Sequence, residues 1–323
     1  MILVTGATGF IGGHLAERLV AQGRAVRCLV RRTSSLASLP SSAIELAEGD
    51  LESGAGLDEA LRGVDTVIHL AGVTKARTPA AYHLGNAQAT ANLVRAAADV
   101  RRFVHVSSLA AAGPSSPHRP VTEEDEPHPV SHYGRSKLAG EEVVRESALA
   151  ARAVIVRPPI VYGPRDRDVF QMIRLVSRGW ILQIGTAPRL FSFIYVGDLV
   201  DGLIAAAVKE NAPGHVFFMA HPAPVTWSEF GKAAARLMGR RAHAVAIPEK
   251  AAYAVGLCAE WGARVSGAPG ILSRDKVTEA CGAGWICDPG RALRELGFRA
   301  CTGLEEGLRR TLAWYKEAGW IKL

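Results

Sequence analysis

The chain has 323 residues, of which 48% are hydrophobic and 21% charged, a composition typical of one or two globular domains and unlike that of disordered, collagen-like or coiled-coil chains. The 38 basic and 31 acidic residues leave a formal charge of +7. Because the basic residues are scattered in short groups, the charge argues against a nucleic-acid-binding tail or a polybasic membrane anchor. We expect a basic surface and no nucleic-acid partner.

The cysteines and the apolar stretches exclude two further classes. The five cysteines include no C-x-x-C pair and have no histidine at zinc-ligand spacing, so we predict reduced thiols and no metal site. No apolar stretch reaches the roughly 20 residues of a membrane span. Met1 leads directly into an apolar strand, without a signal-peptide pattern. We therefore expect a cytoplasmic protein.

The first half of the chain alternates apolar strands with helical patterns. Strands are predicted at 2–4, 25–30, 44–46, 66–70, 103–106 and 154–156, and helices at 13–22, 56–62, 86–98 and 131–150. Strands joined through helices form parallel sheets that are covered on both faces. The sequence thus predicts an α/β fold with a doubly wound parallel sheet, the Rossmann fold.

The texture changes after residue 157, where proline and glycine become frequent. We expect a dinucleotide-binding domain at 1–157 and a smaller C-terminal α/β substrate-binding lobe at 158–323. Within that lobe, 193–219 is predicted to return to the sheet as a strand, a helix and a strand. The proline-rich and acidic stretch 114–129 is predicted to be a mobile loop.

Capping residues mark three helix starts in the second half. Asp198 is predicted to cap a helix over 198–208, and Asp288 a helix that begins at Pro289. Thr302 and Glu305 have the spacing of a capping box.

A glycine-rich turn follows the first strand. Gly6, Gly9 and Gly12 have the spacing G-x-x-G-x-x-G and open the first helix, where backbone N–H groups and the helix dipole favour a pyrophosphate. The turn is therefore predicted to bind a dinucleotide. Its candidate contacts are Gly6, Thr8, Gly9, Phe10, Ile11 and Gly12.

The end of the second strand bears on the choice of cofactor. An NAD site has a carboxylate there to accept the ribose 2′-OH, whereas this strand is followed by Arg31 and Arg32. Guanidinium groups suit a 2′-phosphate. We predict NADP(H) rather than NAD(H); the alternative is that both arginines are merely exposed.

The strongest catalytic pattern is Tyr133-x-x-x-Lys137. Residues at i and i+4 share one helix face, so the Lys137 ammonium can favour ionisation of the Tyr133 phenol. A tyrosine with a pKa near 10 needs such help to exchange protons at neutral pH. The pattern lies about 25 residues after a strand that ends at Ser107-Ser108.

These motifs together resemble the short-chain dehydrogenase/reductase superfamily, in particular its extended branch, the NAD(P)-dependent epimerase/dehydratase family. The resemblance implies that Tyr133 is the general acid/base, that Lys137 lowers its pKa and contacts the nicotinamide ribose, and that Ser108 orients the substrate oxygen. Asn86 would have a supporting role, although it could equally be a helix N-cap. Further cofactor contacts implied by the resemblance are Asp50, Leu51, Leu70, Ala71, Gly72, Pro158 and Ile160, besides Tyr133 and Lys137.

The substrate is less clear from the motifs. Sugar-nucleotide members of the family usually carry an arginine that clamps the substrate diphosphate, where this chain has Phe191 and Ser192, with Arg189 nearby. The 4,6-dehydratases have an Asp-Glu pair where this chain continues with Leu109 and Ala110. The apolar stretch 248–265, before Leu272, is similar to hydroxysteroid dehydrogenase and dihydroflavonol reductase relatives, where it covers the substrate; it could also be plain core or rest on a membrane surface.

We therefore expect an NADP-dependent oxidoreductase that transfers a hydride between nicotinamide and a carbonyl or secondary alcohol of an apolar small molecule. One alternative is an NDP-sugar epimerase with tightly bound cofactor. Another is a nucleotide-binding regulator without catalysis, against which the intact set Ser108, Tyr133 and Lys137 argues. Relatives in the family imply a homodimer through the helices near 86–98 and 136–149.

Overall fold

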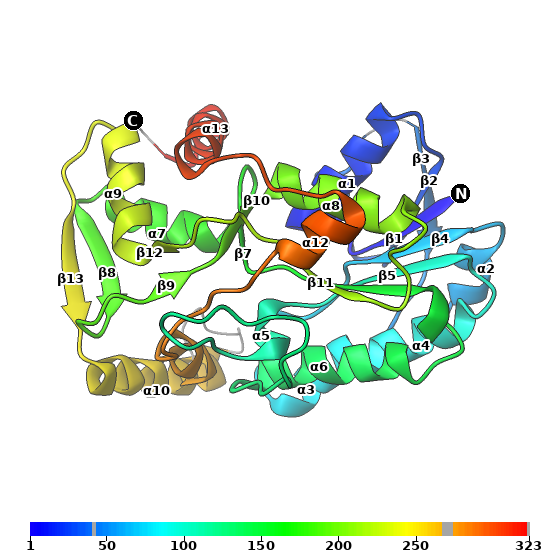
Figure 1. Cartoon of the computed structure of the whole chain (residues 1–323), viewed down its shortest axis with the longest axis horizontal. Coiled ribbons are helices and arrows are strands. Elements are labelled where there is room, and N and C mark those ends of the chain that lie inside the picture. The colour runs from blue at the N-terminus through cyan, green and yellow to red at the C-terminus, as the bar shows by residue number, and fades with distance from the viewer. Residues whose placement is uncertain (41–42, 267–273, 322–323) are drawn as a thin grey trace.

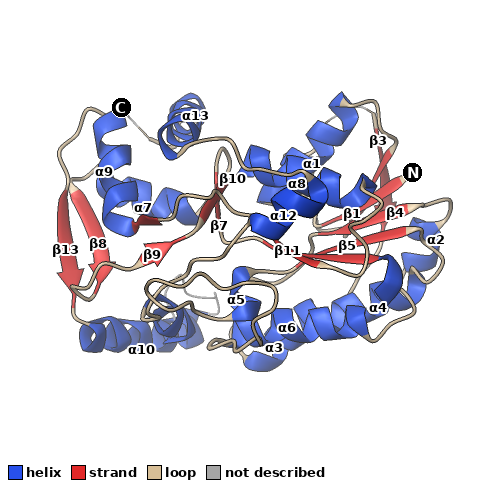
Figure 2. Ribbon diagram, in the orientation of Figure 1, coloured by secondary structure: helices blue, strands red, loops and turns tan. Residues whose placement is uncertain are grey.

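A seven-stranded sheet, parallel throughout, forms the centre of the molecule (Figures 1 and 2). The computed structural model describes residues 1–40, 43–266 and 274–321. The strands, in the order in which they lie, are β11 (Val216–Phe218), β6 (Ala153–Arg157), β5 (Arg102–Val106), β4 (Thr66–His69), β1 (Ile2–Thr5), β2 (Val26–Val30) and β3 (Ile44–Glu48). The order reverses between β1 and β4, which is where open α/β sheets bind ligands at the carboxyl ends of their strands.

Helices cover both faces of this sheet, as the alternation of strands and helices predicts. α1 (Phe10–Ala21) and α8 (Val196–Val208) lie on one face, and α2 (Leu57–Leu61), α4 (Ala89–Ala96) and α6 (His132–Arg145) on the other (Figure 1). α1 begins three residues before the predicted start, directly after Gly9. The fold class expected from the sequence is confirmed.

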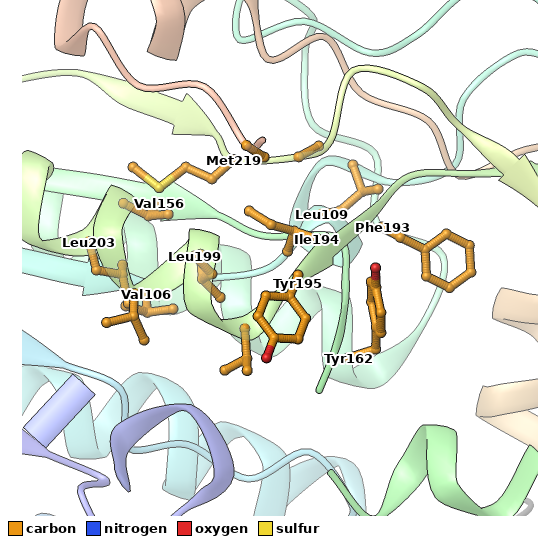
Figure 3. Close-up of a cluster of buried hydrophobic side chains, with 14 of the residues drawn as sticks. Val106, Leu109, Val156, Tyr162, Phe193, Ile194, Tyr195, Leu199, Leu203 and Met219 are labelled. Atoms are coloured by element: carbon orange, nitrogen blue, oxygen red, sulfur yellow. The ribbon is translucent and has the colours of Figure 1, made fainter. Parts of the chain in front are cut away.

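The main core continues from the sheet into the second half of the chain. Leu199 and Leu203 of α8 pack over Val106 and Val156 of the central strands, and the same cluster extends to Tyr162 (Figure 3). Its aromatic members interlock: the ring centroids of Tyr162 and Tyr195 are 5.8 Å apart. One continuous core therefore fixes the second half of the chain against the nucleotide-binding half.

Small sheets and helices build the part of the molecule farthest from the N-terminus, here called the outer lobe (left in Figure 1). It contains the strand pairs β8 (Trp180–Ile184) with β13 (His243–Ile247) and β9 (Leu190–Phe191) with β12 (Val225–Thr226). Its helices are α7 (Asp168–Val176), α9 (Trp227–Leu237), α10 (Glu249–Ser266) and α11 (Arg274–Ala280). A third pair, β7 (Ile160–Tyr162) with β10 (Phe193–Tyr195), joins this lobe to the central sheet.

Shorter elements complete the chain: α3 (Pro79–His83), the π-helical turn η1 (Leu84–Gln88), α5 (Leu109–Ala112), the 3₁₀ turn η2 (Ala150–Arg152), α12 (Gly290–Leu296) and α13 (Leu304–Glu317). The region returning to the sheet does so through α8 and β11, and β11 pairs with β6. The partition at residue 157 stays a prediction.

Two predicted helix caps are wrong for the same reason. Asp198 lies inside the first turn of α8, whose N-cap is Tyr195, and Thr302 precedes Gly303, the N-cap of α13. The Asp198 carboxylate instead accepts hydrogen bonds from the Thr302 N–H and hydroxyl, both at 2.8 Å. The two polar groups thus satisfy each other across 104 residues. A capping box does form at Thr226 and Glu229.

One helix begins one residue later than predicted, and the stretch 114–129 is hydrogen-bonded to a distant segment. The Asp288 carboxylate accepts the Gly290 N–H at 2.8 Å, so α12 begins at Gly290, one residue later than expected. The stretch 114–129 is held by backbone hydrogen bonds from Ser115 N to Gly284 O and from Val121 N to Ile286 O. It lies against 284–288 rather than forming a detached loop.

Candidate active site

The glycine-rich turn is built for close approach of backbone. Gly6 has φ +67°, and a Cβ there would lie 2.6 Å from the Ala71 nitrogen; at Gly12 a Cβ would lie 2.2 Å from Gly6 O. Only glycine fits either position. The N-cap of α1 is Gly9, which offers no side chain to the first N–H groups of the helix. These donors face the cavity described below, so the turn fits the pyrophosphate of a dinucleotide.

Asn86 connects the loop after β4 with α6. The residue lies inside η1, whose N-cap is His83, and before α4, whose N-cap is Gln88, so it caps neither helix. Its buried side chain accepts from Val73 N at 2.7 Å and donates to Val73 O at 3.0 Å and to Ser136 Oγ at 2.8 Å. A Cβ on Gly72 would come within 2.9 Å of Asn86 Oδ1 and 3.6 Å of Lys137 Nζ. Asn86 thereby fixes the loop after β4 against α6.

Ser108, Tyr133 and Lys137 meet where β5 ends. Ser108 is the N-cap of α5 and accepts the Ala110 N–H at 3.1 Å, and its hydroxyl is hydrogen-bonded to the Tyr133 phenol. Lys137 Nζ, one turn farther along α6, donates to Val106 O at 2.7 Å. The structure brings all three side chains to one wall, and a phenol so placed can exchange a proton with a ligand oxygen.

Burial shifts the pKa values of Tyr133 and Lys137. Burial raises the pKa of Tyr133 to about 12, and the hydrogen bond from Ser108 opposes the shift. Burial also lowers the pKa of Lys137 to about 8, with Glu141 acting in the opposite direction. The sequence predicts a Tyr133 pKa lowered by Lys137; in the structure desolvation of the phenol is the largest cause of the shift and raises that pKa. At neutral pH the phenol is protonated and poised to donate.

A buried ion-pair cluster beneath the site was missed by the sequence analysis. Glu141 is fully buried and accepts from Arg157 Nε and Nη2 at 2.8 and 2.7 Å, from Arg145 at 2.7 Å and from Ser107 Oγ at 2.6 Å. The carboxylate lies one helical turn after Lys137 and ties α6 to the ends of β5 and β6. The i+4 spacing from Lys137 was visible in the sequence, but its partner on β6 was not.

These features line one cavity of about 1080 Å³. It runs from the glycine-rich turn past Ser108 and Tyr133 to apolar side chains of the second half of the chain. The predicted site residues that line it are Gly6, Thr8, Gly9, Phe10, Ile11, Gly12, Leu70, Gly72, Asn86, Ser108, Tyr133, Lys137, Pro158 and Ile160. The large apolar side chains that the second half of the chain contributes to the lining are Met172, Phe191, Trp227, Trp285, Trp314 and Trp320.

Five predicted cofactor residues do not line this cavity: Arg31, Arg32, Asp50, Leu51 and Ala71. Arg32 pairs with Glu48 at 3.0 Å on the surface. The Asp50 carboxylate accepts the Glu52 and Ser53 N–H groups, and these bonds lower its pKa. Asp50 thus closes a turn of its own after β3.

Further cavity residues were not identified from the sequence. Ser35, Ala37 and Ser38 follow Arg31 and Arg32, and Ser38 Oγ donates to Thr8 O at 2.9 Å, so this segment crosses the glycine-rich turn. Arg165, Asp166 and Arg167 enter from the loop before α7, and Glu279 from α11. Nothing in the sequence places the loop before α7 beside α1.

Whether the predicted substrate-covering stretch 248–265 covers a substrate stays a prediction. No described side chain of α10 lines the cavity; Val255 and Leu257 are exposed and Ala252 is buried. The following residues 267–273, which include Leu272, lie outside the described part of the chain. Arg189, the remaining candidate for a diphosphate clamp, donates to Ile184 O and Ala280 O and pairs with Glu249.

Neither a metal site nor a membrane span is found in the described residues. No group of three or more His, Cys, Asp or Glu side chains there could hold a metal ion. No helix in those ranges is both long enough and apolar enough to cross a membrane.

Comparison with known proteins agrees with this geometry. Residues 2–220 match the model of the NAD dependent epimerase/dehydratase family. The chain is 32% identical to a ceramide reductase of Caulobacter vibrioides, over 99% of this chain and 96% of that protein. It is 30% identical to a 4-hydroxy-2-methyl-3-oxo-4-farnesyl-3,4-dihydroquinoline-1-oxide ketoreductase of Stigmatella aurantiaca, over 94% and 93%. The crystal structure of gox2253 superposes with a TM-score of 0.83 at 27% identity, covering 100% of this chain and 99% of that one.

The resemblance inferred from the glycine-rich turn and from Tyr133 and Lys137 is thus confirmed. The chain belongs to the NAD-dependent epimerase/dehydratase family, the extended branch of the short-chain dehydrogenases and reductases, and is an NAD(P)-dependent oxidoreductase.

Proposed function

We propose that the protein is an NADP-dependent reductase of a ketone carried by an apolar substrate, with Tyr133 as its general acid. The observation that carries this proposal is the cavity itself: Ser108 and Tyr133 line it together with the glycine-rich turn and with large aromatic side chains, among them four tryptophans. Large apolar side chains in the lining of a cavity favour an apolar ligand. The names of the two relatives, a ceramide reductase and a farnesyl-quinoline ketoreductase, support the same substrate class.

The chain's own residues divide the chemistry between them. The bound nicotinamide would supply the hydride. Ser108 donates a hydrogen bond that orients the substrate carbonyl oxygen, and Tyr133 delivers its phenolic proton to that oxygen as the carbon is reduced. Lys137, held at Val106 O, keeps a positive charge near the phenolate that remains. With a pKa raised by burial to about 12, Tyr133 holds its proton at neutral pH, so the proton is present when the alkoxide forms.

The role of Tyr133 is tested by Tyr133→Phe, which removes only the hydroxyl. We expect turnover to fall by about 10²–10⁴-fold, with cofactor affinity nearly unchanged, because Ser108 and Lys137 keep their other partners. Steady-state rates and a cofactor titration measure the two effects. Tyr82→Phe is the matched control, since its ring lies 6.2 Å from that of Tyr133 but outside the cavity lining. Equal turnover in wild type and Tyr133→Phe would remove Tyr133 from the mechanism.

The preference for NADP rests on Arg31 and Arg32. The Arg32–Glu48 pair is exposed, with the Arg32 side chain 86% accessible, and exposed pairs contribute only about 0–1 kcal/mol. Arg32 can therefore leave Glu48 for a 2′-phosphate at little cost. The neighbouring segment with Ser35 and Ser38 already lines the cavity.

Replacing both arginines, Arg31→Ala and Arg32→Ala, should raise the dissociation constant of NADPH by about 10–100-fold, the value of one or two charge-assisted hydrogen bonds. The dissociation constant of NADH should change by less than about twofold. Fluorescence titration of both nucleotides measures the difference. Tighter binding of NADH than of NADPH by the wild-type protein would contradict the proposal.

The alternative function, an NDP-sugar epimerase, can be tested on the same protein preparation. Arg189 is committed to Ile184, Ala280 and Glu249, which supports an apolar substrate over a nucleoside diphosphate. A stoichiometric cofactor that copurifies with the protein, together with stabilisation against heat by UDP-sugars, would favour the epimerase.

A further inference from the structure

An unpartnered apolar face lies at the tip of the outer lobe. β8 and β13 are parallel and in register, with Trp180 beside His243 and Leu182 beside Val245. Side chains alternate along a strand, so these four residues share one face of the pair and Ile181 points to the other. Ile181 is fully buried, against α9, where a Cβ on Gly231 would lie 2.8 Å from its side chain. The Trp180 face is therefore the outer one, and Figure 1 shows the two strands at the edge of the molecule.

This outer face is exposed although its residues are large and apolar. The exposed fractions of Trp180, Leu182 and Val245 are 50%, 38% and 36%. Scattered single apolar residues are common on protein surfaces, but a contiguous group that includes a half-exposed tryptophan marks an interaction surface.

Three exposed arginines border the same face. Arg178 precedes Trp180, and Arg240 and Arg241 precede β13; the His243 N–H to Gly179 O bond of 2.9 Å joins the two segments. All three arginines are exposed. Within the described ranges, no carboxylate lies within 4.0 Å of any of their guanidinium groups. Tryptophan with arginine, apolar and cationic side by side, is the combination that suits the interface of an anionic bilayer.

We propose that the outer face of β8 and β13, with Arg178, Arg240 and Arg241, docks on an anionic lipid bilayer. The other end of β8 is joined to the cavity lining: Arg189 bonds both Ile184 O, the last residue of β8, and Ala280 O, and Ala280 lines the cavity. Docking would hold the lobe that carries this part of the lining at the membrane from which a lipid substrate would come, a purpose that rests on the proposed function. The docking itself depends only on the surface.

Sedimentation with phosphatidylcholine vesicles, with and without phosphatidylglycerol, tests the proposal on the full chain. We expect binding to the anionic vesicles to exceed binding to the neutral ones. It should weaken when salt rises from about 0.1 M to about 1 M, which shortens the Debye length from about 10 Å to about 3 Å. The triple change Arg178→Gln, Arg240→Gln and Arg241→Gln should lower the partition coefficient by about 100-fold, at roughly fivefold for each basic side chain.

Two variants report on the apolar part of the surface. Trp180→Ser should weaken vesicle binding, and Trp180→Phe should retain binding but lose the quenching of fluorescence by brominated lipid. The matched control carries Arg24→Gln and Leu46→Ser, exposed residues at the opposite end of the molecule, and should bind as wild type does.

Three results would overturn the docking proposal. The first is equal binding to neutral and anionic vesicles, and the second is equal loss in the control. The third is self-association in lipid-free buffer that Trp180→Ser abolishes, because the face would then bind a second copy of the chain. NADPH oxidation with a water-soluble ketone, measured on the same variants, should not change. Vesicle binding without any ketone reduction would refute the proposed function and leave the docking surface standing.

Discussion

Asp166 is a buried carboxyl group at the start of α7, and it lines the cavity. Its two oxygens accept the Asp168 N–H at 2.8 Å and the Val169 N–H at 3.1 Å. Those bonds favour the charged form, yet burial dominates and raises the pKa of Asp166 to about 7. The side chain is therefore a structural cap that carries a proton over much of the acidic range.

This pKa makes the stability of the fold depend on pH in a defined direction. Between pH 4 and 7 the folded protein holds a proton on Asp166 that the unfolded chain has lost, so raising the pH removes stability. Asp166→Asn cannot lose that proton. Relative to wild type, the variant should therefore gain unfolding free energy from pH 4 to 7, by up to roughly 4 kcal/mol at about 1.36 kcal/mol per pKa unit.

Urea unfolding of both proteins at several pH values measures the difference. Asp99→Asn, at an exposed turn, is the control and should leave the pH profile unchanged. A constant difference between wild type and Asp166→Asn across this range would show that Asp166 is already ionised in the folded state.

At the scale of elements, the strands were the most predictable part of the fold. β6 begins with four apolar residues, Ala153 to Val156, and β5 is apolar apart from Arg102 and the buried His105, because parallel strands covered by helices on both faces are mostly apolar. The glycine-rich turn could be predicted equally well, since a Cβ on Gly12 would clash with the backbone of Gly6, only six residues away. Where local chemistry determines the conformation, the sequence alone is sufficient.

Helix starts in the second half were less predictable, because distant groups compete for the capping side chains. Asp198 and Thr302 both have good capping chemistry, but each finds the other in the folded chain. Asn86 shows the same effect: its amide serves Val73 and Ser136, which lie 13 and 50 residues away. Propensity describes what a residue can do locally, and tertiary partners decide which bond forms.

At the scale of the whole molecule, the grouping of Ser108, Tyr133 and Lys137 at one cavity could be predicted from the sequence, whereas the part of the lining from the second half of the chain could not. Ser108, Tyr133 and Lys137 are joined by one strand end and one helix, whose spacing is visible in the chain. The large apolar side chains of the lining come in part from α7, β9, α9 and α13, and no periodicity in the sequence shows that these elements converge. The homodimer through α4 and α6 stays a prediction.

One contact joins the loop before α7 to the nucleotide-binding half across the glycine-rich turn. Arg165, with φ +71°, donates to Glu17 at 2.9 and 2.7 Å and to His14 Nδ1 at 2.8 Å. It also donates to Ser38 O at 3.3 Å, in the segment that crosses the turn. Burial lowers the pKa of His14, which keeps Nδ1 free to accept from the guanidinium while Nε2 donates to Pro164 O.

This bridge should slow the release of the cofactor, because Arg165 holds the segment around Ser38, which lies against the glycine-rich turn. Arg165→Leu should raise the dissociation rate of NADPH by about tenfold or more, the value of one charge-assisted hydrogen bond, while the rate of the chemical step at saturating cofactor stays the same. Stopped-flow displacement and single-turnover kinetics measure the two rates separately. Arg18→Leu is the matched control, since Arg18 lies on α1, the helix of His14 and Glu17, and its guanidinium is 3.5 Å from the Asp201 carboxylate. Equal release from Arg165→Leu and Arg18→Leu would mean that the bridge supports the fold without restraining the cofactor.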